Sequence, residues 1–576
     1  MRNFICISVM VCFSMSLIAQ TTVPDEFKTK IRTFVAQEMK KNKVTGLSIA
    51  LVKGNEVLWT EGFGYANLIN QKKCDDSTLY RAGSVSKLFT ATAIMQLVEA
   101  GKLNLDAPIT EVIPEFSIGS NGYDVNKITI RRLLTHKSGL PSDVFRGLFD
   151  PTPDPIDSII PYLKNENLTN DPGTIFSYSN PGFTLLGYIV QRVSGMPFEA
   201  YMEENILTPL EMNNSAFTIS DKNRDYFSDG FTKNKTSEEP VLFELPAGLL
   251  HTSSIEISHF MIMVLNNGTY AGKQILKEET LRQMLTVQTG DNKLDFSLRM
   301  GLSWFLHDKN SEWEYAGGAA EHGGDTYLYH TQLTVLPEAK IGVVVLTNST
   351  SGVGVARSVT KEILQKAVEQ FENKKAPEEK TPEIWFEKDT ANLLPKLAGG
   401  YTMGPDYLEF TAREKFLFTK QQGIPLCFIP NNLGTYTPAV RLLGFIRIPL
   451  KKQQIHFKQI GGQMYMTYIS GKDTSLLGLR TEVPAATPEW KAMAGNYEGI
   501  DTHEFSVVKK ITIKEANGKI QMLFSGWNIR GKATLIPQNT TQAAIVGVGR
   551  QTGSVVKILG DNIYFSGIIF KKIEKK

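Results

Sequence analysis

Serines that have a lysine three positions later are the residues best suited to covalent chemistry in this chain. A serine hydroxyl becomes a nucleophile when a nearby base takes its proton, and a buried lysine can act as that base. The sequence contains Ser-x-x-Lys four times, beginning at Ser84, Ser358, Ser506 and Ser554. The pattern alone therefore does not single out a nucleophile.

The surrounding sequence separates these four serines. Ser506 and Ser554 lie in segments with strand-like alternation, where residues three apart point to opposite faces of a sheet. Ser358 lies in a helical segment rich in Lys and Glu, which indicates a solvated surface. Ser84 opens an apolar helix expected over residues 84–100, and Lys87 shares its helical face. Ser84 and Lys87 are the preferred pair, although a serine that only caps the helix fits this pattern equally well.

Two further segments carry side chains that could complete such a site. Tyr178-Ser179-Asn180 follows a turn and precedes an apolar helix, so it offers a phenol and an amide on an ordered turn. Glu321-His322-Gly323-Gly324-Asp325 contains the only His-x-Gly of the sequence, and we expect it to lead into a strand at Tyr327. Glycines there would let a substrate approach the backbone, where the next N–H can point at a carbonyl oxygen. Taken alone, His322 is also typical of an ordinary turn.

Periodic patterns indicate the elements that must position these segments. Apolar residues between Phe27 and Met39 recur with helical spacing. Residues 47–51 and 57–59 form an expected hairpin, and residues 327–336 and 341–346 form another near the far end of the region. Strands at both ends with helices between them predict one antiparallel sheet closed by the two ends of the domain.

Five motifs, in this order, resemble the serine β-lactamase-like hydrolases, which include class C β-lactamases, penicillin-binding proteins, related esterases and D-aminopeptidases. The motifs are Gly83-Ser84-Val85-Ser86-Lys87, Leu133-Leu134-Thr135-His136-Lys137-Ser138-Gly139-Leu140-Pro141, Tyr178-Ser179-Asn180-Pro181-Gly182, Pro246-Ala247-Gly248-Leu249 and His322-Gly323-Gly324. The resemblance covers about residues 25 to 370. It implies an α/β (α+β) β-lactamase-like domain, with an antiparallel sheet flanked by helices, a helical subdomain, and the site between them.

The resemblance also implies roles for individual residues. The implied catalytic residues are Ser84 as nucleophile, with Lys87 and Tyr178 as its proton-transfer partners. The implied substrate-binding residues are Asn180, His322 and Gly324. The implied oxyanion-hole donors are the backbone N–H groups of Ser84 and Asp325. The implied route is acylation of Ser84 followed by hydrolysis.

The third motif departs from the pattern of β-lactamases and penicillin-binding proteins, which generally carry Lys-Thr-Gly there. His322 stands in place of the cation, and histidine is mostly neutral near pH 7, so attraction of a substrate carboxylate is weakened. His-x-Gly is instead similar to the D-aminopeptidase and esterase branches. We expect a serine hydrolase that cleaves an amide or ester, such as a D-aminopeptidase, another peptidase or an esterase. The alternatives are a penicillin-binding or cell-wall ligand-binding protein with little turnover, or a β-lactamase.

The composition changes after a charged stretch that contains two prolines. We predict a hydrolase domain at 25–371, a linker at 372–390, and two β-rich, barrel-like (lipocalin-like) units at 391–484 and 488–576. Leu397-Ala398-Gly399-Gly400-Tyr401 recurs as Met493-Ala494-Gly495-Asn496-Tyr497, which indicates a repeat. Closed barrels would hide the strand edges of these units. The layout resembles D-aminopeptidase, which also carries two β-barrel domains after its catalytic domain.

Composition and targeting signals exclude some classes of function. The 62 Lys and Arg residues against 59 Asp and Glu leave a formal charge of +3, which provides no basic field for nucleic acid. Residues 1–19 read as a signal peptide cleaved near Ala19, so we expect a periplasmic or secreted protein with no transmembrane segment after cleavage; an uncleaved anchor is the alternative. The eight histidines show no His-Glu-x-x-His spacing, and we expect no metal and no cofactor. The expected partner is a small-molecule or peptide substrate, and the oligomeric state stays open.

Overall fold

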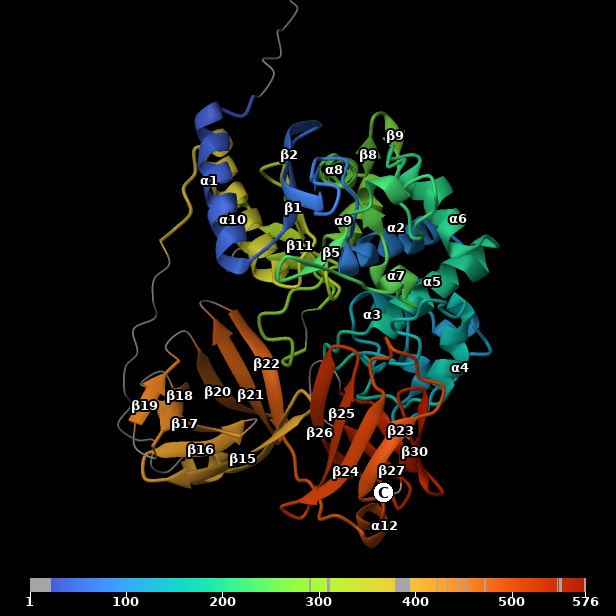
Figure 1. The fold of residues 1–576 in the computed structure, drawn as a ribbon, viewed down its shortest axis with the longest axis vertical. Coiled ribbons are helices and arrows are strands. Elements are labelled where there is room, and N and C mark those ends of the chain that lie inside the picture. The colour runs from blue at the N-terminus through green and yellow to red at the C-terminus, as the bar shows by residue number, and fades with distance from the viewer. Residues whose placement is uncertain are drawn as a thin grey trace, which may run out of the picture.

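The structure is a computed structural model that describes residues 22–289, 292–307, 311–378, 394–421, 423–431, 434–443, 446–450, 453–470, 473–545, 547 and 552–573. The expected signal peptide and residues 379–390 of the expected linker lie outside the described residues. A region of sheet and helices forms the upper part of the molecule in Figure 1, and two β-barrels lie below it.

A seven-stranded antiparallel sheet, in the order β10-β11-β12-β13-β1-β2-β3, forms the centre of the first region. β1 (Gly46–Lys53) pairs with β13 (Ile341–Thr347), and Leu47 lies opposite Thr347. The two ends of the region therefore close one sheet, as the two expected hairpins predict. The other strands are β2 (Glu56–Asn67), β3 (Lys72–Lys73), β10 (Phe305–His307), β11 (Ala319–Asp325) and β12 (His330–Leu336).

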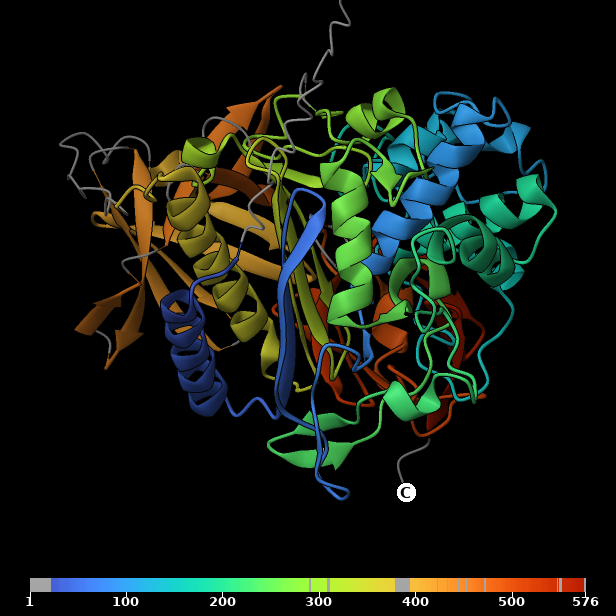
Figure 2. The ribbon, with the colours of Figure 1, turned by 90° about the horizontal axis from the view of Figure 1, so that it is seen from above.

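Helices cover both faces of this sheet (Figure 2). α1 (Asp25–Asn42) and α10 (Gly352–Glu372) pack together on one face, and Leu47, Ile49 and Leu51 of β1 point into their core. Ala50 and Val52, the alternate residues, face a second and larger core with α8 (Ser254–Leu265). This larger core continues into a helical subdomain. Its helices are α2 (Ser86–Glu99), α3 (Ile130–Leu134), α4 (Ile159–Lys164), α5 (Asn180–Ser194), α6 (Phe198–Met202), α7 (Leu245–Gly248) and α9 (Glu278–Met284).

Short two-stranded sheets complete this region. They are β4 (Tyr80–Arg81) with β7 (His251–Thr252), β5 (Gly230–Thr232) with β6 (Lys235–Ser237), and β8 (Thr269–Tyr270) with β9 (Lys273–Gln274). The pair β4–β7 has a direct bearing on the site, because β4 leads into the turn that carries Ser84.

Two sequence-based expectations about local structure are corrected. Ser84 lies in a 3-10 turn, η1 (Gly83–Val85), and α2 begins only at Ser86, because a glycine in the left-handed region opens this turn and Ser86 bonds back to it. His322 lies within strand β11 and not in a turn before a strand, because His322 pairs with Leu333 of β12. The strand that follows begins at His330 and not at Tyr327.

The C-terminal region consists of two closed eight-stranded barrels, which confirms the expected pair of β-barrel units. In the first, β14, β15, β16, β17, β18, β20, β21 and β22 form the ring, and β19 pairs with β18 outside it. These strands are β14 (Gly399–Met403), β15 (Asp406–Arg413), β16 (Phe416–Gln421), β17 (Ile424–Pro430), β18 (Thr435–Leu442), β19 (Ile446–Pro449), β20 (Gln454–Ile460), β21 (Gln463–Ser470) and β22 (Asp473–Arg480).

The second barrel follows the chain order from β23 to β30, and β30 closes onto β23. Its strands are β23 (Gly495–Gly499), β24 (Lys510–Ala516), β25 (Lys519–Gly526), β26 (Ile529–Pro537), β27 (Gln542–Ile545), β28 (Val555–Leu559), β29 (Asn562–Phe565) and β30 (Ile568–Ile573).

The repeated five-residue motif makes the same contact in each barrel. A short helix, α11 (Leu394–Leu397) or α12 (Pro488–Ala492), precedes the first strand. The Tyr401 hydroxyl donates to the carbonyl of Leu397 at 3.1 Å, and the Tyr497 hydroxyl donates to that of Met493 at 2.7 Å. The buried tyrosine thus ties the first strand to the end of the helix in both units. Across the described residues of the whole chain, no helix is both long and apolar enough to cross a membrane.

Candidate functional site

The turn that carries Ser84 is held in place by its own glycine and by Ser86. Gly83 has φ +55°, and a Cβ there would lie 2.6 Å from the backbone nitrogen of Asp325, so a larger residue does not fit. The Ser86 hydroxyl donates to the Gly83 carbonyl at 2.6 Å and accepts from the N–H of Leu250 at 2.9 Å. Ser84 itself is partly exposed, at the mouth of a pocket.

Strand β11 runs directly against this turn. A Cβ at Gly324 would lie 1.8 Å from the carbonyl oxygen of Ala82 and 3.2 Å from the nitrogen of Ser84. The backbone N–H groups of Ser84 and Asp325 therefore belong to two segments in close contact, and neither segment leaves space for a side chain between them. Two backbone donors on adjacent segments are the usual form of an oxyanion hole.

Lys87 joins the nucleophile to the helical subdomain. Its side chain is fully buried, and its ammonium nitrogen Nζ lies 3.1 Å from Ser84 Oγ, 2.8 Å from Asn180 Oδ1 and 2.6 Å from the carbonyl oxygen of Ala247. The charged lysine donates to all three oxygens. A neutral amine in the same place would accept the Ser84 proton at hydrogen-bonding distance.

The carboxamide of Asn180 makes a second hydrogen bond, which fixes its orientation. Its Nδ2 donates to Asp143 Oδ1 at 2.8 Å, which turns its oxygen Oδ1 toward Lys87. The residue begins α5, whose N-cap is Ser179; the Ser179 hydroxyl accepts from the N–H of Gly182 at 3.1 Å. The helix start thus holds the amide at a fixed place in the site.

The phenol ring of Tyr178 lies between Lys87 and two histidines. Lys87 Nζ is 4.9 Å from the centre of the ring, and the His136 ring stacks on it at 4.1 Å with 26° between the planes. His136 Nδ1 accepts the N–H of Ser179 at 3.0 Å, so this ring also holds the backbone next to Tyr178. His322 contributes the third ring, with its centre 6.4 Å from that of Tyr178.

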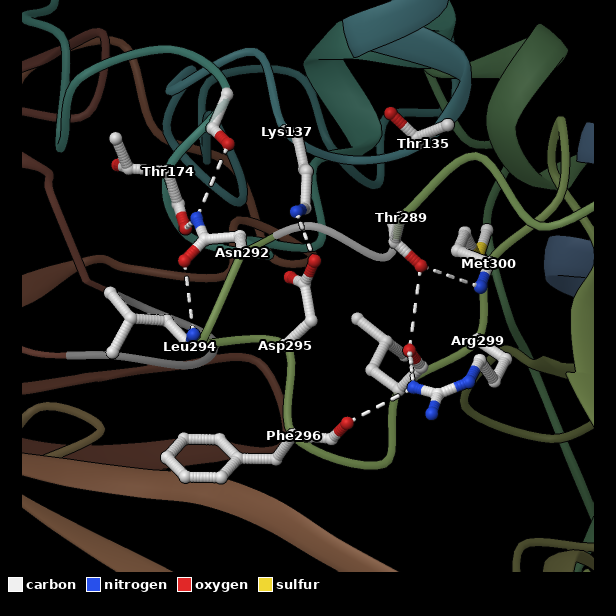
Figure 3. A network of polar contacts seen from close by, with 12 residues as sticks. Thr135, Lys137, Thr174, Thr289, Asn292, Leu294, Asp295, Phe296, Arg299 and Met300 are labelled. Carbon is white, nitrogen blue, oxygen red and sulfur yellow. Dashed lines mark hydrogen bonds and ion pairs between the residues drawn. The ribbon is translucent and has the colours of Figure 1, made fainter. Parts of the chain in front are cut away.

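The segment that carries His136 is anchored by a buried ion pair (Figure 3). Lys137 Nζ lies 2.6 Å from Asp295 Oδ2, and both side chains are almost fully buried. Two residues beyond Asp295, the Ser297 N–H donates to the carbonyl of Thr474 at 3.0 Å, and Thr474 belongs to the first barrel. The motif around His136 is therefore fixed from the side of this barrel.

His322 is a neutral residue at the physiological pH. Burial and the nearby charge of Lys87 lower the pKa of His322 to about 4. Its Nδ1 lies 2.6 Å from the carbonyl oxygen of Gly323, and Nε2 has no hydrogen-bond partner among the described residues. A neutral imidazole cannot replace the lysine of a Lys-Thr-Gly motif as an attractor of carboxylates.

A pocket of about 320 Å³ opens beside Ser84. Its wall is mixed: large apolar side chains form one part, and polar groups, among them the carboxylates of Asp143, Glu244 and Asp325, form the rest; none of the described residues that line it is Lys or Arg. The apolar side chains are Phe145, Leu148, Phe149, Leu242, Tyr327, Val507, Trp527 and Ile529. The last three come from the second barrel, so two domains build one pocket.

The other three Ser-x-x-Lys pairs do not form comparable sites. The Ser358 hydroxyl donates to the carbonyl of Val355 on α10, and Lys361 pairs with Glu312 at 2.6 Å. Ser506 and Ser554 lie in loops directly before β24 and β28, a small correction to the expectation that strands contain them. No such pair other than Ser84 and Lys87 has a hydrogen bond between its two side chains among the described contacts.

The sequence alone did not assign roles to several residues that complete this arrangement. Asp143 orients Asn180, His136 stacks on Tyr178, and the Ala247 carbonyl accepts from Lys87. Two of these, His136 and Ala247, lie within quoted motifs, so a signal was present. Within the described part of the chain, no group of three or more His, Cys, Asp or Glu residues could hold a metal ion.

Comparison with known proteins assigns the fold and the family. The structure has an antiparallel sheet flanked by helices, and the Ser84 turn lies between the sheet and a helical subdomain. This is the arrangement expected of a β-lactamase-like fold. The family model described as Beta-lactamase matches residues 31–367, more than half of the chain, and the protein belongs to this family. Members of the family are generally serine hydrolases.

Individual relatives and solved structures share only limited sequence identity with this chain. Protein flp of Staphylococcus aureus strain MW2 is 28% identical over 248 residues, which are 42% of this chain and 50% of the relative. The chain thus spans about half the length of the curated relatives it matches. The octameric penicillin-binding protein homologue from Pyrococcus abyssi shares 23% identity and a TM-score of 0.51, over 79% of this chain and 100% of that chain. A β-lactamase/D-alanine carboxypeptidase from Pseudomonas syringae shares 21% identity and a TM-score of 0.51, over 59% and 99%. These two likenesses show the fold.

Proposed function

We propose that this protein is a serine hydrolase that cleaves an amide or ester bond through an acyl-enzyme on Ser84. The observation that carries the proposal is the position of Lys87 Nζ, which is fully buried and within hydrogen-bonding distance of Ser84 Oγ. Export from the cytoplasm to the periplasm or the exterior is part of the proposal, because residues 1–19 have the pattern of a signal peptide.

The proposed reaction has two steps. Ser84 Oγ attacks the scissile carbonyl as its proton passes to the Lys87 and Tyr178 pair, and the backbone N–H groups of Ser84 and Asp325 stabilise the oxyanion, with ~3 kcal/mol typical for one such donor. The pair returns the proton to the leaving amine or alcohol. Water then releases the acyl group by the same route, while Asn180, His322 and Gly324 help to position the substrate.

The charges on the wall of the pocket favour a neutral or cationic substrate over one with a carboxylate. Three carboxylates and no lysine or arginine line the described pocket, and His322 is neutral. These features support a peptidase or esterase, including an aminopeptidase for D-residues, over a β-lactamase.

A substrate panel tests the proposal. The wild type, Ser84→Ala and Ser358→Ala are each incubated with a short-chain p-nitrophenyl ester, D- and L-amino-acid anilides and a chromogenic β-lactam. Ser358→Ala is the control, because it alters another Ser-x-x-Lys pattern of the same chain. We expect hydrolysis of at least one ester or anilide, a loss of at least about a thousandfold in Ser84→Ala, and no loss in Ser358→Ala. If no substrate is turned over and a fluorophosphonate leaves Ser84 unlabelled, the proposal is wrong and a ligand-binding role is favoured.

A further inference from the structure

The second barrel supplies part of the wall of the Ser84 pocket. Trp527 and Asn528 form the two-residue turn between β25 and β26, where Gly526 pairs with Ile529. Trp527, Asn528 and Ile529 all line the pocket. The N–H of Trp527 donates to the carbonyl of Ser506 at 2.9 Å, so this turn is held within the barrel.

Trp527 lies in a cluster of aromatic rings contributed by three segments. Its ring centre is 5.0 Å from that of Phe149 and 5.0 Å from that of Tyr327, at angles of 61° and 57°. Phe505 packs on it from within the barrel at 5.6 Å. Such edge-on and tilted contacts fix the indole plane and leave an apolar surface toward the pocket.

The barrel side of this pocket is firmly docked. Phe145, which precedes the pocket segment at 148–149, lies in the hydrophobic core of the second barrel, and its N–H donates to Ser566 Oγ at 2.8 Å. His503 Nε2 lies 3.1 Å from Asp150 Oδ2 at the other end of that segment. The aromatic wall is therefore built into the interface between the domains.

The pocket opens directly at the nucleophile. Ser84, Asn180 and Asp325 line it, whereas Tyr178 and Lys87 do not. In the proposed reaction, the leaving group receives its proton from the Lys87 and Tyr178 pair, so the leaving group faces these two side chains. The acyl group stays bound to Ser84 after the leaving group departs, so we assign to it the pocket that Ser84 and Asp325 line.

We infer that this pocket binds the apolar part of the substrate acyl group, and that Trp527 of the second barrel selects aromatic or branched acyl groups over small ones. The inference rests on the proposed acyl-enzyme route and deepens it by naming the substrate class. The volume of about 320 Å³ and the aromatic part of the wall around Trp527 suit a phenyl or branched alkyl substituent, for which burial in place of water is favourable. The barrel is thus a specificity element of the hydrolase.

A series of p-nitrophenyl esters with one leaving group and varied acyl groups tests the inference. The measured quantity is the ratio of kcat/KM for the 3-phenylpropanoyl ester to that for the acetyl ester. We expect a ratio above about ten in the wild type, and about a tenfold lower ratio in Trp527→Ala and in Phe149→Ala. Trp527→Phe should restore most of the ratio. Leu559→Ala, which removes an exposed apolar side chain elsewhere on the same barrel, should leave the ratio unchanged.

The outcomes separate this inference from the proposed function. If the esters are hydrolysed by Ser84 but the wild type shows no preference, or folded Trp527→Ala keeps the wild-type ratio, the inference is overturned while the proposed function stands. If a series with one acyl group and varied leaving groups shows the Trp527 dependence instead, the acyl assignment is overturned. If no ester is hydrolysed and Ser84 is not labelled, the proposed function itself fails. The thermal unfolding midpoint of each variant confirms that it is folded.

Discussion

At the scale of single residues, the site depends on groups that fix the backbone as much as on those that would react. Glu239 is the main example. Its carboxylate accepts the N–H of Tyr327 at 3.0 Å and that of Leu328 at 2.8 Å, and it lies 3.6 Å from Arg81. Arg81 is in the strand before the Ser84 turn, so one buried pair holds the segments on both sides of the proposed oxyanion hole.

Glu239→Gln should therefore lower kcat with little change in KM. Because the variant loses charge-assisted bonds to the turn after Asp325, we expect kcat to fall about ten- to a hundredfold through misplacement of one oxyanion donor. Steady-state kinetics on the best ester measure kcat and KM separately. Glu238→Gln, at the exposed neighbouring position, is the control. A variant that is less stable but keeps the wild-type kcat would show that Glu239 is only structural.

The approach of Ser84 to Lys87 could be predicted from the sequence, because a helical spacing of three residues places two side chains on one face. The contact of Lys87 with Ala247 and the stacking of His136 on Tyr178 could not, because each joins segments far apart in the chain. The resemblance to a family marked these segments as belonging together. The roles that it implies for Tyr178, Asn180, His322 and Gly324 stay predictions.

At the scale of elements, alternation predicted β1 and β13 well, because each has the apolar pattern of a strand buried in a sheet. Of β2 it predicted only residues 57–59, because the rest of this longer strand is mostly half-buried and contains glycines and polar residues. It failed for β11, because Glu321, His322 and two glycines do not alternate in the usual way. Strand β11 is stable because β10 and β12 pair with it on both sides. Gly324 weakens the strand pattern of the sequence, and the same glycine lets β11 approach the Ser84 turn. At this position the geometry of the site overrides local strand propensity.

At the scale of the whole molecule, the second barrel is joined to the first region by its core and by polar contacts, of which the one between Tyr564 and Glu166 is buried. The Tyr564 hydroxyl of β29 donates to Glu166 Oε1 at 3.0 Å, and Lys557 donates to the carbonyl of Asn165 at 2.6 Å. Glu166 Oε2 is buried and has no partner among the described residues. The sequence predicted two barrels, but which surface of each meets the sheet region depends on pairs such as Glu166 and Tyr564, which no local pattern reveals.

Glu166 should make the stability of this assembly depend on pH. Burial raises the pKa of Glu166 from 4.5 to about 7. Between these values the folded protein keeps a proton that the unfolded chain releases, so the free energy of unfolding falls as the pH rises through this window. Glu166→Gln removes this titration, and we expect it to be more stable than the wild type at pH 8 by about 1–3 kcal/mol, but not at pH 4.

Denaturant unfolding at pH 4, 6 and 8 measures this difference, and Glu204→Gln, on an exposed surface, is the control. Equal pH dependence in the wild type and in Glu166→Gln would show that the buried carboxyl does not titrate in this range.

The central claim is that Lys87 activates Ser84, and the rate of covalent labelling tests it most directly. Intact-mass spectrometry and peptide mapping follow a fluorophosphonate on the wild type, Lys87→Met and Lys361→Met, the last altering the matching lysine near Ser358. We predict a single adduct on Ser84 in the wild type and in Lys361→Met, and labelling at least about a hundredfold slower in folded Lys87→Met. An adduct on another residue, or equal labelling of Lys87→Met, would contradict the account.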